Sequence, residues 1–169
     1  AVGNPCKVKR LITEEDKKFI EKAIALSGEG MNNGIGGTFG AIVVKDGEII
    51  AEGYNQVTSA NDPTAHAEVV AIREACKKLN SFQLDDCVIY TSCEPCPMCL
   101  GAIYWARPKA VFYGCTKEDA AEIGFDDQFI YDEIDGGIEN RSIRFINVGR
   151  EAGKAIFDKW KVKEGRIEY

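Results

Sequence analysis

The chain has 169 residues, of which 45% are hydrophobic, and this is enough to bury one compact core without disulfide or metal staples. Its formal net charge of −6 argues against a nucleic-acid partner, because proteins that bind a phosphate backbone need clustered Lys and Arg. No apolar run approaches the roughly 20 residues that cross a bilayer, and the first residues lack a signal-peptide pattern. We therefore expect one domain over residues 1–169, a small neutral substrate, and neither a membrane nor a nucleic acid as partner.

The first predicted element is an amphipathic helix. Thr13 followed by Asp16 is typical of a helix N-terminus, and Gly28 and Gly30 are expected to end the helix. Its apolar face comprises Phe19, Ile20, Ala23 and Ile24. The residues before it, 1–6, are expected to be flexible.

A hairpin and a second helix follow. Residues 39–44 and 48–52 have the pattern of two strands, and Asp46-Gly47 is a tight-turn dipeptide between them. From His66, apolar residues recur every three or four positions, as on the buried face of a helix. The residues of this face are Val69, Ile72, Cys76 and Leu79. His66 is therefore expected to open a helix.

Strand and helix patterns alternate through the rest of the chain. We expect a strand at 87–91, a helix at 97–105, a strand at 110–113, two helical pieces within 117–133 and a strand at 143–148. A last helix is expected to turn Ala152, Ala155, Ile156 and Trp160 inward. Alternation of this kind implies parallel crossovers and predicts a three-layer α/β/α domain with a polar tail at 163–169.

The cysteine pattern points to a metal site. Of the seven cysteines, Cys93, Cys96 and Cys99 lie close together, which suits metal ligation better than a disulfide framework and favours a reducing, cytoplasmic setting. Pro97 is typical of a first helical position, so Cys96 and Cys99 are expected in the first turn of a helix, where the helix dipole favours thiolates. With His66, the one histidine of the chain, they form a ligand set for Zn²⁺.

Glu68 lies two residues after His66 and is expected to stand beside the metal rather than to bind it. A carboxylate in that place can take a proton from a water molecule activated by zinc. Three protein ligands leave one tetrahedral position for that water, as in catalytic rather than structural zinc sites. The pattern therefore predicts a zinc-dependent hydrolase.

Other interpretations of the same residues remain open. Cys93 could join His66, Cys96 and Cys99 in a closed structural zinc site of an interaction module, which would leave Glu68 without a role. The three cysteines could also begin an iron–sulfur site, although a fourth cysteine followed by proline is absent. A solitary histidine can also be an ordinary polar residue.

Four stretches carry a resemblance to a known family. They are residues 36–41 (Gly-Gly-Thr-Phe-Gly-Ala), 61–68 (Asn-Asp-Pro-Thr-Ala-His-Ala-Glu), 92–99 (Ser-Cys-Glu-Pro-Cys-Pro-Met-Cys) and 124–127 (Gly-Phe-Asp-Asp). His-x-Glu with Pro-Cys-x-x-Cys is the signature of zinc-dependent deaminases. The whole set resembles the bacterial guanine deaminases, which implies a cytidine-deaminase-like fold with a five-stranded mixed central sheet and one Zn²⁺ per chain. One departure is Thr38, where the family commonly has proline.

The resemblance also implies substrate-binding residues. Phe39 would stack on a purine ring, Asn55 would present a donor and an acceptor to its edge, and Trp105 would form a wall of the pocket. Each also has an ordinary interpretation: Phe39 and Trp105 as core residues, and Asn55 as a turn residue.

Two further roles come from the resemblance alone. Asp127 would act as a second proton-transferring residue, although Asp126 or Asp127 could instead cap a helix. Tyr169 matches the terminal tyrosine of a family whose members form homodimers in which the C-terminal segment covers the partner's pocket. The other interpretation of this end is a frayed terminus.

The expected reaction is hydrolytic deamination of guanine to xanthine and ammonia in purine catabolism or salvage. In it, Glu68 takes a proton from water and passes it to ring nitrogen N3, and Asp127 serves the departing amino group. The alternatives are a deaminase of another amino-heterocycle, such as guanosine, a triazine, cytosine or adenine, and a tRNA adenosine deaminase, which the acidic composition disfavours.

Overall fold

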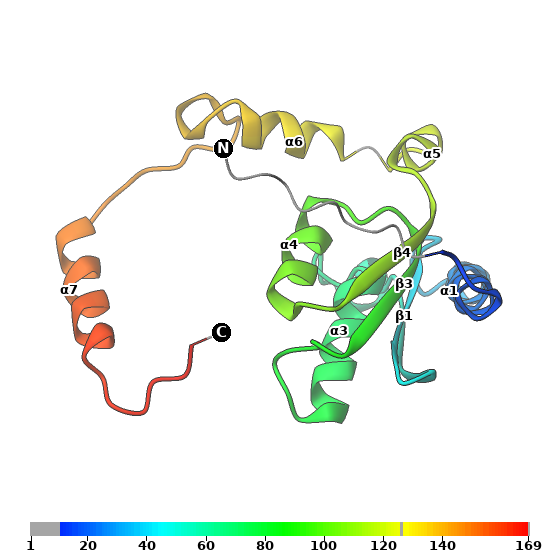
Figure 1. Ribbon diagram of the computed structural model, residues 1–169. Coiled ribbons are helices and arrows are strands. Elements are labelled where there is room, and N and C mark those ends of the chain that lie inside the picture. The colour runs from blue at the N-terminus through cyan, green and yellow to red at the C-terminus, as the bar shows by residue number, and fades with distance from the viewer. Residues whose placement is uncertain (1–10, 126, 169) are drawn as a thin grey trace. The chain divides into compact units, whose positions relative to one another are not determined.

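The computed structural model describes residues 11–125 and 127–168 (Figure 1). The chain divides into two compact units, one that ends at Thr116 and one that begins at Lys117. Within the described residues, no helix is both long and apolar enough to span a membrane. The helices and strands of the first unit are α1 (Glu14–Asn32), β1 (Gly40–Lys45), β2 (Glu48–Tyr54), α2 (Val57–Ala60), α3 (Ala67–Leu79), β3 (Cys87–Cys93), α4 (Pro97–Ala106) and β4 (Ala110–Cys115).

A mixed sheet in the order β2-β1-β3-β4 forms the centre of the first unit. β1 pairs antiparallel with both β2 and β3, and β3 pairs parallel with β4. The β1–β2 hairpin turns through Asp46 and Gly47 at positive φ angles of 50° and 79°, which confirms the turn expected from this dipeptide. Helix α4 connects β3 to β4, so the expected parallel crossover is also confirmed.

Helix α1 covers one face of the sheet (Figure 1). Its capping box is the predicted one: the Thr13 hydroxyl accepts from the backbone N–H of Asp16, and the Asp16 carboxylate accepts from the backbone N–H of Thr13. The other oxygen of the buried Asp16 carboxylate accepts a 2.6 Å hydrogen bond from the Tyr90 hydroxyl on β3. The ring of Tyr90 stacks on Phe112. Capping and core packing therefore fix α1 on this face together.

Helices α3 and α4 cover the opposite face, which completes the three predicted layers (Figure 1). The contact between α3 and β2 is tight at Gly53. A Cβ atom at this position would lie 2.4 Å from the carbonyl oxygen of Ala67 and 2.8 Å from the backbone nitrogen of Ala71. Because no side chain intervenes, the first turn of α3 rests directly on the sheet. This contact sets the distance between the sheet and the residues at the start of α3.

The second unit consists of short helices joined by extended chain. Its elements are α5 (Lys117–Glu122), α6 (Gln128–Asp135), the 3-10 turn η1 (Ile138–Asn140) and α7 (Arg150–Lys161). The two helical pieces expected within 117–133 are therefore present. Among its described residues, Ala120 is the one buried residue.

Three expectations from the sequence are wrong in the described part of the chain. The sheet there has four strands rather than five, because residues 143–148 form no strand and leave Phe145 56% exposed. Helix α7 forms, but Ile156 and Trp160 are exposed rather than turned inward. Helix α1 continues past Gly28 and Gly30 to Asn32, because the lack of a side chain at Gly30 lets the helix pack closely against Tyr54.

Candidate metal centre and active site

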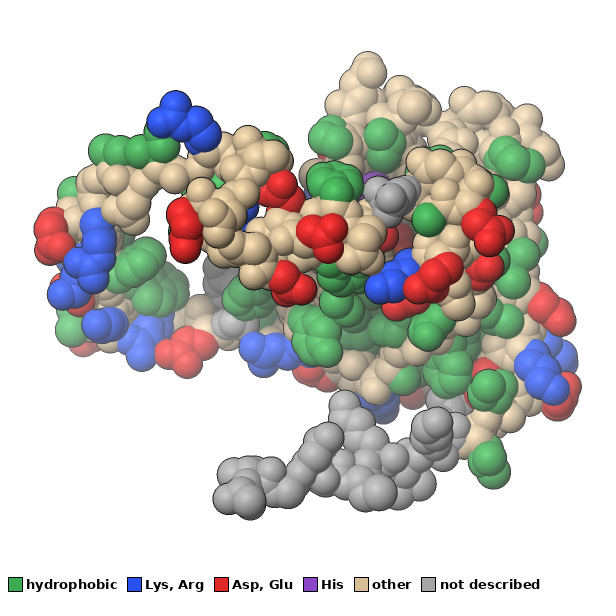
Figure 2. All heavy atoms as spheres, turned by 90° about the horizontal axis from the view of Figure 1, so that it is seen from above, with side chains coloured by type: hydrophobic (Ala, Val, Ile, Leu, Met, Phe, Trp, Pro, Cys, Tyr) green, Lys and Arg blue, Asp and Glu red, His purple; other side chains and the backbone are tan. Residues whose placement is uncertain are grey.

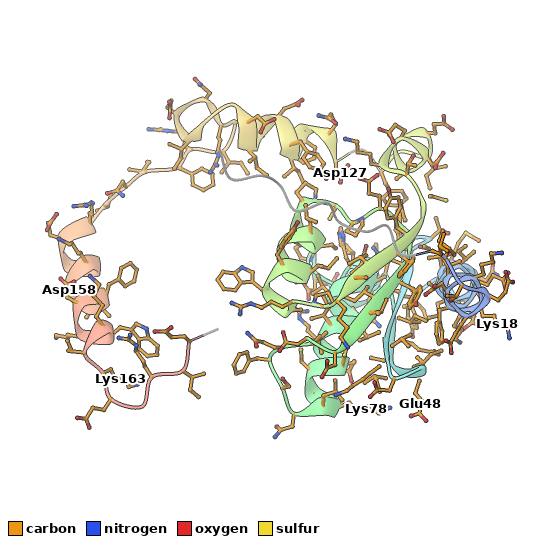
Figure 3. All side chains as sticks on the ribbon, viewed as in Figure 1. Lys18, Glu48, Lys78, Asp127, Asp158 and Lys163 are labelled. Carbon is orange, nitrogen blue, oxygen red and sulfur yellow. The ribbon has the colours of Figure 1, made fainter. Side chains whose placement is uncertain are left out.

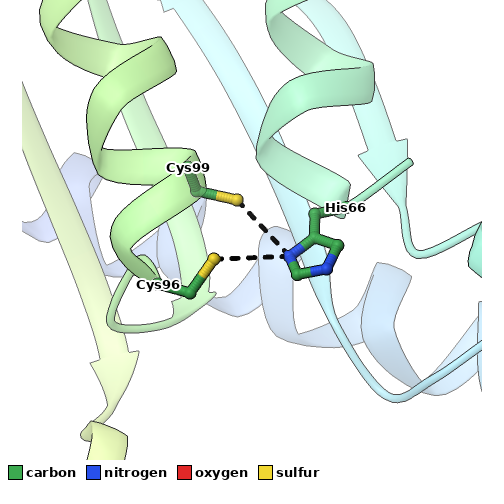
Figure 4. A group of neighbouring side chains, drawn as sticks. All are labelled: His66, Cys96 and Cys99. Atoms are coloured by element: carbon green, nitrogen blue, oxygen red, sulfur yellow. Dashed lines mark hydrogen bonds between the residues drawn. The ribbon is translucent and has the colours of Figure 1, made fainter. Parts of the chain in front are cut away.

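Three side chains converge where α3 and α4 begin (Figure 4). His66 is the N-cap residue of α3, Cys96 is the N-cap residue of α4, and Cys99 lies in the first turn of α4. The Nδ1 atom of His66 lies 3.5 Å from the Sγ atom of Cys96 and 3.5 Å from that of Cys99. All ligand atoms of the group lie within 4.8 Å of one another. The structure thus brings together the three predicted metal ligands.

The spacing of these atoms fits a tetrahedral zinc ion. Zinc bonds of about 2.3 Å to sulfur and about 2.0 Å to nitrogen, at a tetrahedral angle, place a sulfur and a nitrogen about 3.5 Å apart. The two nitrogen–sulfur distances, each 3.5 Å, match that separation. One imidazole and two sulfurs are also a donor set that zinc prefers. The donor set and the two nitrogen–sulfur distances therefore suit Zn²⁺.

Hydrogen bonding within the group already favours a thiolate. The neighbouring Cys99 side chain, together with the nearby His66 ring, lowers the pKa of Cys96 to about 4. The interaction with Cys96, together with burial, raises the pKa of Cys99. In the absence of metal the pair therefore holds one proton, and zinc takes its place because zinc binds cysteine as thiolate.

Cys93 stands apart from this group. It is the last residue of β3, and its Sγ atom donates to the carbonyl oxygen of Thr116 at 3.4 Å. Burial raises the pKa of Cys93 to about 11, which keeps its thiol protonated. Within residues 11–125 and 127–168, the ligand group comprises His66, Cys96 and Cys99 without it. This arrangement favours the open three-ligand site over the closed one, and it gives no support to an iron–sulfur site.

Glu68 lies beside the metal ligands on the first turn of α3 and is 6% exposed. One carboxylate oxygen, Oε1, accepts a 3.2 Å hydrogen bond from the Thr91 hydroxyl, and the other, Oε2, accepts one of 3.4 Å from the Cys99 thiol. Burial raises the pKa of Glu68, although a hydrogen bond from its own backbone N–H acts in the opposite direction. A raised pKa suits a group that both takes and returns protons near neutral pH.

The loops around the metal ligands bring Phe39 and Asn55 together. The backbone N–H of Asn55 donates to the carbonyl oxygen of Phe39 at 3.0 Å, and the next residue, Gln56, donates to Ala65, which precedes His66. The Asn55 Oδ1 atom accepts from the backbone N–H groups of the residues at 37 and 57, each at 3.2 Å. The buried Asn55 therefore holds the glycine-rich loop between α1 and β1 against the loop that presents His66.

The remaining predicted residues differ in what the structure says of them. Trp105, on α4, is 63% exposed, which excludes the interpretation as a plain core residue in this chain. Asp127 occupies the N-cap position of α6 without a side-chain capping hydrogen bond, and Figure 3 labels it there. Asp127 belongs to the second unit, so its relation to the metal ligands stays a prediction. Asp126 and Tyr169 lie outside the described residues.

One contact of the site was not anticipated from the sequence, namely that between Thr91 and Glu68. The alternation of β3 places Thr91 on the same face as Ile89, toward α3. That period of two could have predicted that Thr91 faces the helix. It could not have predicted which side chain Thr91 meets, because the partner lies 23 residues away in the chain.

Comparisons with known proteins agree with this site. Residues 13–115 match the family model of the cytidine and deoxycytidylate deaminase zinc-binding region. A guanine deaminase from Bacillus subtilis is 62% identical over 151 residues, which cover 89% of this chain and 97% of that protein. An X-ray structure of guanine deaminase from Bacillus subtilis superposes with a TM-score of 0.89 at 59% identity and covers 94% of this chain and 99% of the other.

A more distant relative matches over less of the chain. A tRNA-specific adenosine deaminase from Aquifex aeolicus is 49% identical over 79 residues, which are 47% of this chain and 52% of that protein. The likeness to the Bacillus subtilis proteins instead extends into the second unit, since it covers nearly the whole of both chains. The chain therefore belongs to the bacterial guanine deaminase family and contains the zinc-binding region of the cytidine and deoxycytidylate deaminases.

Proposed function

We propose that this protein catalyses the zinc-dependent hydrolysis of guanine to xanthine and ammonia. The observation that carries the proposal is the carboxylate of Glu68, which lies buried beside a three-ligand zinc site in a chain 62% identical to a guanine deaminase. A bound zinc ion supplies a water molecule acidic enough to act as a nucleophile near neutral pH. The residues of the chain supply proton transfer and orientation.

Glu68 moves the protons of the reaction. It takes a proton from the attacking water as the oxygen adds to the ring carbon that carries the 2-amino group, and it delivers that proton to ring nitrogen N3. Its burial supports both steps, because the raised pKa brings the proton affinity of Glu68 closer to those of the water that gives the proton and the N3 atom that receives it. The added hydroxyl group then gives up its proton and becomes the C2 carbonyl of xanthine, while the 2-amino group gains a proton and leaves as ammonia.

Phe39, Asn55 and Trp105 are the proposed substrate-binding residues. The amide nitrogen of Asn55 can donate to a ring acceptor while its Oδ1 atom holds the surrounding loop. Phe39, partly buried against the core, offers an aromatic face for stacking, and the exposed ring of Trp105 offers a wall. Asp127 is proposed to carry the proton of the departing amino group.

We also propose that the protein is a homodimer in which the C-terminal segments are exchanged and Tyr169 covers the partner's pocket. The composition of the second unit supports this proposal. Helix α7 exposes Phe157, Trp160 and Ile156, an apolar face of the kind that usually packs against another surface. In that arrangement, residues 1–169 form one deaminase domain whose site is completed by the partner.

Mixed dimers test the exchange. Full-length copies with Glu68→Gln are co-expressed with copies that keep Glu68 and end before residue 150. If the tails cross over, the intact site of the truncated copy receives the tail of the full-length copy. Ammonia release then recovers in the mixture, although each variant alone is inactive. Sedimentation of the unsubstituted chain as a monomer, or no recovery in the mixture, would contradict the exchange.

A small substrate in the cytoplasm is consistent with the surface and the cysteines. On the face that Figure 2 shows, Lys and Arg lie interspersed with Asp and Glu rather than gathered in a basic stripe. The six described cysteines are free thiols, as expected of a protein from a reducing compartment. We therefore propose a purine base rather than tRNA as the substrate, and purine catabolism or salvage as its setting.

Ammonia release from a panel of amines tests the proposed reaction. The panel holds guanine, guanosine, adenine, cytosine and ammeline, each with and without a zinc chelator. Guanine is expected to react fastest, and chelation is expected to stop the reaction. Turnover of another amine with guanine inert would replace the substrate and leave the reaction class in place.

A further inference from the structure

The proton-transferring carboxylate of the proposed reaction is held at one oxygen by a side chain with no assigned role. Thr91 lies in the middle of β3, where its neighbours in register are Ala41 on β1 and Tyr113 on β4. Its side chain is 1% exposed, and its hydroxyl donates to Glu68 Oε1 at 3.2 Å. A hydroxyl on a central strand, paired on both sides, is among the most rigid donors that a fold can offer.

Zinc binding makes this hydrogen bond more important. In the metal-free chain, Glu68 Oε2 accepts from the Cys99 thiol at 3.4 Å. Zinc binds cysteine as thiolate, and a thiolate has no proton to donate. Of the two side chains that donate to Glu68 within the described residues, Thr91 would then be the one that remains. With zinc bound, the carboxylate would be held at Oε1 and would be free to exchange protons at Oε2.

We propose that Thr91 is a positioning residue for Glu68: its hydroxyl fixes Oε1, so that Oε2 is the oxygen that exchanges protons with water and substrate. The bond suits both states of the carboxyl group. With Glu68 ionised, the hydroxyl donates to Oε1, and with a proton on Oε2, it donates to the same atom as a carbonyl oxygen. Thr91 therefore keeps the side chain in one orientation through the whole proton cycle.

This inference rests on the proposed function and extends it to one further residue. Four side chains at position 91 separate a positioning role from a packing role. Thr and Ser carry the hydroxyl, whereas Val and Ala lack it. Thr and Val fill the same space, whereas Ser and Ala leave a small cavity in the core.

The positioning role and the packing role place Ser and Val in different orders of kcat. If Thr91 positions Glu68, kcat follows the hydroxyl: Thr91→Val and Thr91→Ala lower kcat by about tenfold to a hundredfold, as expected for a misplaced catalytic group, and Thr91→Ser restores most of it. KM and zinc content stay near those of the unsubstituted chain. Stability follows volume instead, so the denaturant midpoint falls further for Ser and Ala than for Val.

A second measurement needs no substrate. In crystal structures of the zinc-loaded chains, the Glu68 carboxylate is expected to keep its orientation in Thr91→Ser and to rotate in Thr91→Val. The inference is overturned if kcat follows volume, if it is the same for Val and Ser, if Thr91→Val loses zinc, or if Glu68 is unmoved in Thr91→Val. An unsubstituted chain that is inert toward guanine would instead refute the proposed substrate, and the series would then be measured with the amine that reacts.

Discussion

Because β2 and α3 lie in close contact at Gly53, we expect a substitution at this position to disturb the metal centre. With Gly53→Ala, the new Cβ atom would lie 2.4 Å from the carbonyl oxygen of Ala67, whereas ordinary contact begins at 3.4 Å. Helix α3 must therefore move away from the sheet by about 1 Å. Ala67 lies between His66 and Glu68, so the displacement carries both with it.

The expected effects follow from the size of that shift. Overpacking of a core costs about 1–3 kcal/mol of unfolding free energy. Metal sites tolerate ligand deviations of about 0.2 Å, so a shift of about 1 Å in His66 should weaken zinc binding, by roughly tenfold to a hundredfold. At saturating zinc, turnover should still fall by about a hundredfold, because Glu68 is misplaced as well.

Gly40→Ala is the matched control, since its Cβ would meet backbone on the opposite face of the sheet. That atom would lie 2.3 Å from the carbonyl oxygen of Ala23, so the same kind of clash displaces α1 rather than α3. Denaturant unfolding should show both variants destabilised, and competition with a chromogenic chelator should show weakened zinc binding for Gly53→Ala alone. Equal zinc affinities in the two variants would refute the argument that the contact with β2 sets the distance of His66 from the sheet.

Other substitutions probe the centre directly. Glu68→Gln should keep zinc and lower kcat by about 10²–10⁴. Burial raises the pKa of Glu68, so in the zinc-free chain this carboxyl group adds to the free energy of unfolding below its ordinary pKa of 4.5. That added stability is lost as pH rises through the pKa of the folded state. The free energy of unfolding of zinc-free Glu68→Gln, measured across pH, should not show this loss. Cys96→Ser should release zinc and Cys93→Ser should retain it, as measured by metal analysis after dialysis. When the free zinc concentration is 100 times the dissociation constant, removal of zinc should lower the unfolding free energy of the chain by about 2.7 kcal/mol.

Local signals explain why much of this site could be predicted from the sequence. The helix starts at His66 and Cys96 depend on residues within one turn of each start, and so does the capping box at Thr13. The metal ligands follow from chemistry, because one histidine and a Cys-x-x-Cys pair leave few other choices.

Contacts between distant segments could not be predicted in the same way. The hydrogen bond from Tyr90 to Asp16 joins residues 74 positions apart, and that from Thr91 to Glu68 joins residues 23 apart. A sequence pattern states that such a side chain faces inward, but the pairing of strands and helices decides what it meets. Gly53 belongs to the same class, since a glycine in a strand suggests a close approach without naming the helix that approaches.

The errors at the C-terminal end have a different cause. Apolar residues at 143–148 and on α7 follow the periods of a strand and of a helix, and those periods were interpreted as faces buried within the chain. In the structure, Ile146, Ile156 and Trp160 are exposed, although burial of each would contribute roughly 1.5–3 kcal/mol. Periodicity reports that a face favours burial, and it carries no information on whether the covering surface belongs to the same chain. Exposed apolar faces at positions where the pattern predicts core are therefore what an exchanged dimer would leave in the structure of one chain.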